Sequence, residues 1–286
     1  MDNLKAKKRH PEEIAVYTAI YVCAAFSVLL LLGIIIYVFA KGARRVNWAF
    51  LTGVTSILHG TVGIAGNILN TLIIILLTMI ITTPIGVGAA IYLNEYAKPG
   101  KLVTVITFAT ETLAGIPSII FGLFGMLFFG QLCHMGYSLL TGSLTLTLMV
   151  LPLVTRNTQE ALKTVPDSFR TGAVGLGAGK WYTIRTILLP SAMPGIVTGV
   201  ILAIGRIIGE SAALLFTAGS AHLLPKTFNA FLEKIFHSGG TLTIQLYLSA
   251  SKGEFEVAFG IAVVLLVIVL LINFGTKRLA KKLEKH

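Results

Sequence analysis

Two pairs of opposite charges interrupt otherwise uncharged stretches of the chain. Arg206 and Glu210 lie in the sequence ILAIGRIIGESAALLF, and Arg156 and Glu160 lie in LPLVTRNTQEAL. In each pair the glutamate follows the arginine by four residues, which places both side chains on one face of a helix, where they can form an ion pair. The planar guanidinium group of arginine donates two parallel hydrogen bonds to phosphate or carboxylate. These pairs are therefore suited to joining helices or to contacting an oxyanion.

The surroundings of Arg206 and Glu210 place both residues inside an apolar helix. A central arginine costs about 2.5–3.5 kcal/mol on membrane-insertion scales, so it normally faces protein or water and is paired. The same helical stripe carries the small residues Gly195, Gly199 and Ala203, which let helices approach closely. Two interpretations fit this pattern: a buried ion pair that only holds helices together, and a polar lining of a translocation path.

The composition is that of a membrane protein. The chain has 286 residues, of which 55% are hydrophobic and 12% are charged, and its mean hydropathy is +0.85. A soluble domain has about 25% charged residues. The net charge of +11 does not form one patch, because the basic residues fall between long uncharged stretches. This distribution favours loops between membrane spans and argues against nucleic acid as a partner.

The uncharged stretches predict an all-α integral membrane protein with six transmembrane helices. A helix that crosses the hydrocarbon core needs about 20 apolar residues. The first apolar run is about twice as long as that of a secretory signal, so we expect it to remain as a span. We expect a transmembrane domain over 19–276 between basic cytoplasmic tails, 1–18 and 277–286. The predicted spans are 19–39, 71–93, 104–129, 138–155, 191–217 and 257–276.

The distribution of Lys and Arg predicts that both termini are cytoplasmic. With this orientation the inner segments hold 16 of the 23 basic residues: four in the N-terminal tail, two in 94–103, five in 156–190 and five after residue 276. Three basic residues on the opposite side, Lys41, Arg44 and Arg45, go against the rule. The two cysteines, Cys23 and Cys133, lie in or beside apolar runs and have no metal-ligand spacing.

The sequence carries no recognisable catalytic motif. The run GAVGLGAGKW over 172–181 fails the phosphate-binding loop pattern, because Val174 stands where the first glycine is needed and Trp181 stands where Ser or Thr must hold magnesium. The chain has neither an H-E-x-x-H nor a G-x-S-x-G sequence. We therefore predict no catalytic residue, no metal site and no cofactor.

The segment 156–190 is the longest connection predicted on the cytoplasmic side. It is rich in glycine, and its apolar residues Trp181, Tyr182, Ile184 and Ile187 recur at nearly helical spacing. This pattern predicts a short amphipathic helix, a turn and a second short helix. Such a hairpin suits docking into a groove on a soluble partner.

The same segment resembles the signature loop of ABC importer permeases. That signature has a glycine, an isoleucine ten residues later and then Leu-Pro, here Gly177, Ile187, Leu189 and Pro190. The Glu-Ala-Ala that usually opens the signature is replaced, and Thr171 stands at the position of its glutamate. No role of that carboxylate is therefore transferred to this chain.

The sequence that follows the loop is more specific. SAMPGIVTGVILAIGRIIGESAALLFTAG resembles the phosphate-specific ABC transporter permeases, and its ending resembles their A-type subunit (PstA family). LAGIPSIIFGLFG and PIGVGAAIYLNEYA also resemble this family, so the resemblance covers about 84–276.

The resemblance implies a type I permease bundle in the bacterial or archaeal cytoplasmic membrane, surrounded by lipid. The chain would form a heterodimer with a second permease subunit, bind two copies of a cytoplasmic ATPase and receive substrate from an extracytoplasmic phosphate-binding protein. ATP hydrolysis would take place in the ATPase subunits, and this chain would be no enzyme. The path residues would be Arg206, Glu210 and Arg156. The ATPase-coupling residues would be Gly177, Trp181, Ile187, Leu189 and Pro190.

Other functions remain open at this point. The transported anion can instead be sulfate, molybdate or a phosphonate, because Arg206 shows charge but not the shape of a pocket. The chain can also be a non-conducting structural or regulatory membrane subunit. An intramembrane enzyme is disfavoured by the missing motifs.

Overall fold

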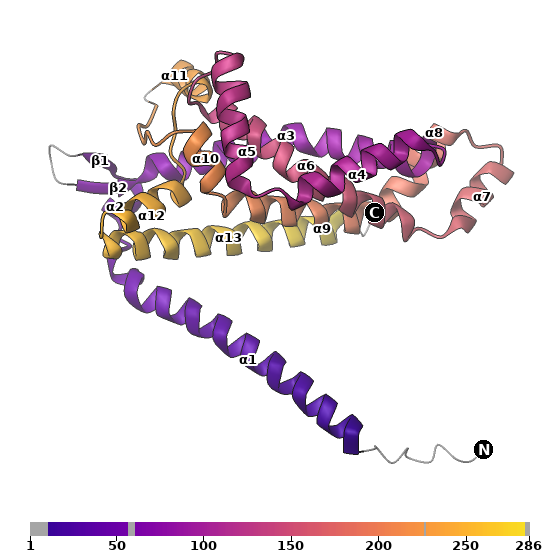
Figure 1. The fold of residues 1–286 in the computed structure, drawn as a ribbon, viewed down its shortest axis with the longest axis horizontal. Coiled ribbons are helices and arrows are strands. Elements are labelled where there is room, and N and C mark those ends of the chain that lie inside the picture. The colour runs from indigo at the N-terminus through magenta and orange to yellow at the C-terminus, as the bar shows by residue number, and fades with distance from the viewer. Residues whose placement is uncertain (1–10, 57–60, 226, 284–286) are drawn as a thin grey trace.

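The computed structural model describes residues 11–56, 61–225 and 227–283. Most of these residues lie in helices, and a small two-stranded hairpin sits at one end of the molecule (Figure 1). The strands β1 (Val54–Ser56) and β2 (Thr61–Ile64) are antiparallel. The helices are α1 (Pro11–Gly42), α2 (Trp48–Thr52), α3 (Ala65–Ile91), α4 (Lys101–Gly115), α5 (Ser118–Gly125), α6 (Leu139–Lys163), α7 (Asp167–Gly175), α8 (Lys180–Thr183), α9 (Leu189–Ile208), α10 (Ala212–Thr217), α11 (Phe228–Glu233), α12 (Leu242–Ser251) and α13 (Phe255–Leu283).

Five helices in the described residues are long and apolar enough to cross a membrane, and a bent pair of helices can supply a sixth span. The pair consists of α4 and the helix that begins with α5, which meet at 104°. The span predicted over 104–129 is therefore not one continuous helix but a bent pair. The bend lies at Ile116, which is extended (φ −72°, ψ 130°), because the residue before a proline is driven out of the helical region, and Pro117 follows.

Two other predicted boundaries differ from the structure. The span expected over 191–217 ends early, since α9 stops at Ile208 and α10 is a separate short helix. The loop expected to begin at residue 156 begins later, because α6 continues to Lys163. The basic residues predicted in the N-terminal tail, Lys5 to Arg9, lie outside the described residues, as do the last three residues of the C-terminal tail.

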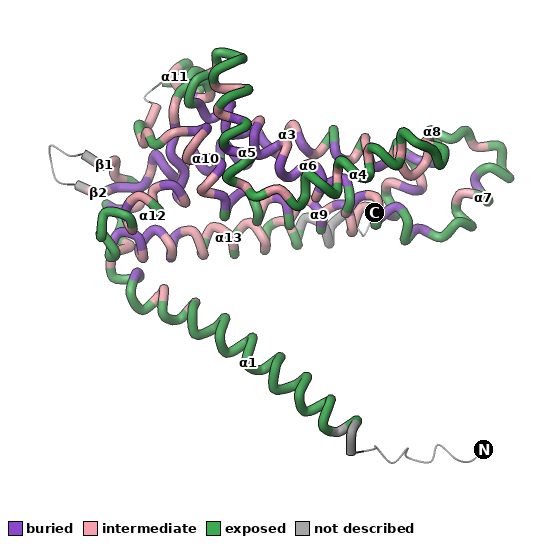
Figure 2. Tube along the Cα trace, in the orientation of Figure 1, coloured by how far each residue is buried: buried purple, intermediate pink, exposed green. Residues whose placement is uncertain are grey.

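The core of the bundle lies between α3, α6, α9 and α10, and Figure 2 shows buried positions along α3 and α6. The small residues of α9 pack where the sequence predicts close helix contact. A β-carbon added at Gly195 would lie 2.5 Å from the Cβ of Ala161, and one added at Gly199 would lie 2.7 Å from the Cβ of Asn157. Because no larger residue fits at these positions, the glycines set the distance between α6 and α9.

Helix α1 stands apart from this core. It leaves the bundle near α13 and is exposed along almost its whole length (Figures 1 and 2). None of its most apolar 18-residue stretch is buried within the chain. The end of α1 is held where Tyr37 packs edge to face on Phe259, with ring centroids 5.7 Å apart. Its apolar surface is thus left for lipid or for another subunit.

Candidate functional site

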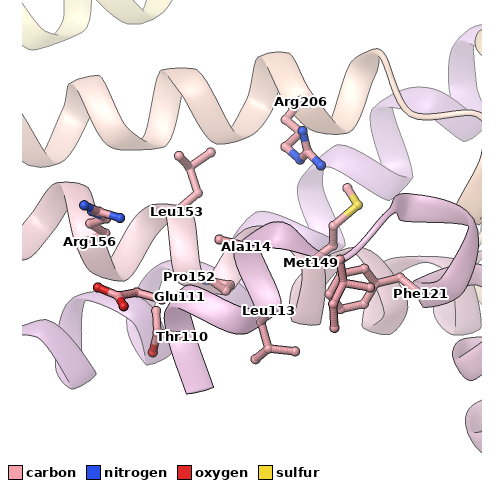
Figure 3. Close-up of a pocket in the computed structure, with 11 residues that line it drawn as sticks. Thr110, Glu111, Leu113, Ala114, Phe121, Met149, Pro152, Leu153, Arg156 and Arg206 are labelled. Atoms are coloured by element: carbon pink, nitrogen blue, oxygen red, sulfur yellow. The ribbon is translucent and has the colours of Figure 1, made fainter. Parts of the chain in front are cut away.

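A cavity of about 250 Å³ opens between α4, α6 and α9 (Figure 3). Three charged side chains line it: Glu111 from α4, Arg156 from α6 and Arg206 from α9. Apolar residues, among them Met149 and Pro152, make up most of the remaining wall. The sequence analysis predicted Arg206, Glu210 and Arg156 as residues of one path, and the fold brings Arg156 and Arg206, but not Glu210, to one cavity.

The charges in this cavity are not neutralised by one another. In the described residues, none of Glu111, Arg156 and Arg206 takes part in an ion pair, and all three side chains are exposed in the isolated chain. The predicted pair between Arg156 and Glu160 is wrong, because Glu160 pairs with Lys163 at 3.0 Å instead. Two cations and one carboxylate therefore remain available to an ion or to another subunit.

The predicted ion pair between Arg206 and Glu210 is also wrong. The spacing of four residues requires a continuous helix, but α9 ends at Ile208 and Glu210 lies beyond its end. The Oε1 atom of Glu210 accepts a hydrogen bond from the backbone N–H of Ala213 at 3.1 Å, and its carbonyl oxygen accepts one from the hydroxyl group of Thr243 at 2.7 Å. Glu210 is thus buried and fixes the start of α10, while Arg206 stays free.

Helices α7 and α8 form a hairpin at the far end of the bundle from the β-strands (Figure 1). Gly177 lies between them with a φ of +78°, a left-handed conformation that favours glycine. The N–H of Gly177 donates to the carbonyl oxygen of Val174, and that of Ala178 donates to Ala173. This turn ends α7 in the manner of a glycine C-cap, so the predicted helix–turn–helix hairpin is confirmed and its turn lies at Gly177.

The hairpin exposes large apolar side chains. Leu176 at the tip is 91% exposed and Trp181 on α8 is 59% exposed. The later part of the loop signature packs differently, because Ile187 and Leu189 are only partly exposed and their neighbour Leu188 is buried. Trp181 is therefore free to contact another molecule, whereas Ile187 and Leu189 join the hairpin to the bundle.

One ion pair that the sequence analysis missed fixes the base of the hairpin. The Nη2 atom of Arg170 on α7 lies 2.9 Å from the Oε1 atom of Glu95, which follows α3 in a π-helical turn, Tyr92–Tyr96. Arg170 also donates to the carbonyl oxygens of Leu162 and Val165, each at 3.0 Å. Only the isolated charges of Arg170 and Glu95 mark this pair in the sequence, and they are 75 residues apart.

The environment of Arg170 favours its charged form. The hydrogen bond to Glu95 raises the pKa of Arg170 above its ordinary value, and partial burial opposes this effect less strongly. A second contact ties the same two elements together, since the ammonium group of Lys180 lies 4.7 Å from the ring centroid of Tyr96. The hairpin is thus held to the end of α3 by two cationic side chains.

Comparison with known proteins assigns this arrangement of helices to a family. The family model described as binding-protein-dependent transport system inner membrane component matches residues 82–286. The chain belongs to this family. The match covers α4 to α13, including the cavity and the hairpin.

Curated relatives agree with the family. The chain is 36% identical over 273 residues to the probable ABC transporter permease protein YqgI of Bacillus subtilis, covering 92% of this chain and 93% of that protein. It is 35% identical over 246 residues to the phosphate transport system permease protein PstA of Xylella fastidiosa, covering 84% of this chain and 82% of that protein. The resemblance to PstA permeases is therefore confirmed.

Solved structures share the fold. A bacterial alginate ABC transporter in complex with its periplasmic protein superposes with a TM-score of 0.71 at 14% identity, over 96% of both chains. The MetNI methionine ABC transporter in an inward-facing conformation superposes with a TM-score of 0.58 at 21% identity, over 77% of this chain and 94% of that chain. The predicted helical bundle of an ABC importer permease is confirmed.

Together these findings establish a multi-pass membrane permease subunit of an ABC importer. Its relatives are transport permeases rather than enzymes. In the described residues no group of three His, Cys, Asp or Glu side chains is placed to hold a metal ion.

Proposed function

We propose that this permease forms half of the translocation path of an ATP-driven inorganic phosphate importer that works by alternating access. The observation that carries the proposal is the cavity in which the free guanidinium groups of Arg206 and Arg156 meet Glu111. Relatives named as PstA phosphate permeases, at about a third sequence identity over most of the chain, support phosphate as the anion.

The composition of the cavity suits a transient oxyanion site. Two arginines that form no ion pair with the described residues can each offer a pair of hydrogen bonds to the oxygens of phosphate. Glu111 in the same wall would repel the anion and keep its binding weak enough for release. The exposed apolar rim would be covered by a second, related permease subunit, which would complete a heterodimeric path.

Glu210 has a different place in this proposal. It does not line the cavity described above, and its carboxylate holds the start of α10. We infer that it acts on the path by fixing the break between α9 and α10, directly after the free Arg206. A direct contact between Glu210 and phosphate would need α10 to move.

The α7–α8 hairpin would connect the path to ATP hydrolysis in a separate subunit. Exposed Trp181 and Leu176 offer apolar anchors for a groove on one of two cytoplasmic ATPase copies, and the second permease subunit would dock on the other copy. Gly177 gives the hairpin its turn, and Ile187, Leu189 and Pro190 would pass its motion into α9. With the hairpin in the cytoplasm, both termini would lie on the cytoplasmic side of a bacterial or archaeal membrane. The transmembrane domain would cover 19–276, and the cytoplasmic tails would cover 1–18 and 277–286. An extracytoplasmic phosphate-binding protein would load the opposite side.

The test is phosphate uptake into proteoliposomes that contain the complete transporter. Arg206→Gln removes a charge-assisted interaction of about 1.5–3 kcal/mol, so we expect uptake to fall about 10- to 100-fold while the complex assembles normally. Arg206→Lys should restore part of the rate, since it keeps the charge but not the paired hydrogen bonds. Lys252→Gln, an exposed cation that does not line the cavity, is the control and should leave uptake unchanged.

Competition identifies the anion. An excess of unlabelled phosphate should abolish uptake of labelled phosphate, and sulfate, molybdate or a phosphonate should not. Stronger competition by one of those anions would assign the transporter to that anion instead. Normal phosphate uptake by Arg206→Gln would remove Arg206 from the path.

A second experiment addresses a non-conducting, regulatory subunit. In a background with Cys23→Ser and Cys133→Ser, both of which replace exposed thiols, Leu202→Cys places a thiol one helical turn before Arg206. A water-soluble thiol reagent should label it in one nucleotide state and not in the other. Absence of labelling in every nucleotide state would support the regulatory function.

A further inference from the structure

A second cavity, of about 710 Å³, lies where the end of α1 meets the start of α13. Lys41, Arg44 and Arg45 line it together with one carboxylate, that of Glu256. We propose that these three basic residues bind the phosphate group of an anionic phospholipid. This site is separate from the proposed translocation path, because the residues that line the two cavities do not overlap.

The cations of this cavity lack an anionic partner. In the described part of the chain, none of Lys41, Arg44, Arg45 and Glu256 takes part in an ion pair. The Nε atom of Arg45 is buried and has no hydrogen-bond acceptor. The three cations and the single carboxylate thus leave the cavity with a net positive charge that an anion from outside the chain can neutralise.

Arg45 is held in place at the base of the cavity. Its guanidinium carbon lies 5.9 Å from the ring centroid of Phe50, and its stem packs so closely on α13 that a β-carbon added at Gly260 would lie 3.1 Å from its Cγ. Arg44 and Lys41 are exposed at the mouth of the cavity. The site thus combines one packed guanidinium group with two exposed cations.

The surroundings favour a lipid over a free anion. The cluster follows directly after the uncharged run 14–40 of α1, whose apolar side chains are exposed along the helix. Tyr37, Phe255 and Phe259 also line the cavity, and aromatic rings of this kind gather at the level of lipid headgroups. A headgroup phosphate would sit among the cations while its acyl chains follow the apolar surface of α1.

The charge balance agrees with an anionic headgroup. The three cations outweigh the single carboxylate, and Glu256 lies in the first turn of α13, where the helix dipole already stabilises its charge. Basic side chains next to a membrane helix attract anionic lipid headgroups. The same cluster is the one that departs from the usual distribution of basic residues, and lipid binding gives that departure a physical cause.

The experiment is native mass spectrometry of the complete transporter with added phosphatidylglycerol, because the mass distinguishes a lipid adduct from a phosphate adduct. We expect the unaltered complex to retain phosphatidylglycerol at least tenfold more strongly than phosphatidylcholine. The double variant Arg44→Gln/Arg45→Gln should show this preference for phosphatidylglycerol reduced at least tenfold. Lys252→Gln, a nearby exposed cation outside the cavity, should keep it.

Two results would overturn the proposal. Displacement of phosphatidylglycerol by millimolar inorganic phosphate would assign the cavity to a free oxyanion. An unchanged lipid preference in the double variant would place the bound lipid elsewhere. If the double variant does not assemble, the single variant Arg44→Gln, at the exposed mouth, gives the same comparison with a smaller expected loss of about threefold, corresponding to roughly 0.7 kcal/mol.

Discussion

The arginine of the hairpin, Arg170, and the two arginines of the central cavity have opposite environments. Arg170 bridges Glu95 and Asp167 and donates to two backbone carbonyl groups. Arg206 and Arg156 have no anionic partner in the described residues. A guanidinium group whose donors are used holds elements together, whereas one whose donors are free is available to a passing anion. The difference separates a positioning arginine from a proposed binding arginine.

The largest effect on stability is expected from Arg170→Gln. The side chain of Glu95 is 8% exposed, and removing the partner of a buried charge costs about 3–5 kcal/mol. Thermal unfolding of the purified complex should show a clear loss of stability, and ATP hydrolysis should become independent of substrate. Arg206→Gln is the matched control, because removing the guanidinium group of Arg206 should leave the unfolding temperature nearly unchanged while uptake falls.

A double variant sharpens this comparison. Glu95→Gln combined with Arg170→Gln removes both charges. The double variant should therefore lose less free energy of unfolding than the sum of the losses in the two single variants. Additive effects would mean that Arg170 acts through its two backbone contacts instead. Equal losses of stability in Arg170→Gln and Arg206→Gln would contradict the distinction between the two arginines.

A smaller effect is expected from Gly177→Val in the turn of the hairpin. The φ of +78° at Gly177 costs a residue with a β-carbon about 1–2 kcal/mol, and a β-branched residue is disfavoured most. The hairpin should deform, so that ATP hydrolysis and uptake become uncoupled in reconstituted vesicles while the bundle stays folded. Gly175→Val is the control, because Gly175 has an ordinary φ and open space around its α-carbon. Unchanged coupling in Gly177→Val would show that the α7–α8 hairpin is not the element that docks on the ATPase.

The smallest effect on stability is expected from Glu210→Gln. The amide oxygen of the glutamine can still accept the hydrogen bond from the N–H of Ala213. The loss in free energy of unfolding should therefore stay below about 1 kcal/mol, the usual cost of removing a helix cap. Uptake should be largely retained if Glu210 only fixes the helix break. A loss of uptake as large as that of Arg206→Gln would show that the negative charge itself is needed in the path.

The sequence predicted the bundle well because its signals are local. Uncharged runs of sufficient length identified the spans, and Gly195 and Gly199 identified the contact between α6 and α9. The predicted ion pair of Arg206 and Glu210 failed because spacing on a helix assumes that the helix continues, and the break after Ile208 turns Glu210 toward a backbone N–H. The pair of Arg170 and Glu95 was missed because no local pattern joins residues 75 positions apart.

Helix α1 is attached to the rest of the chain at one end only. Gly42 packs so tightly on α13 that a β-carbon there would lie 2.3 Å from the carbonyl oxygen of Phe259, yet none of the central apolar stretch of α1 is buried. Changing the tilt of α1 therefore breaks no core packing within this chain. The thickness of the bilayer and the shape of the neighbouring subunit therefore set that angle.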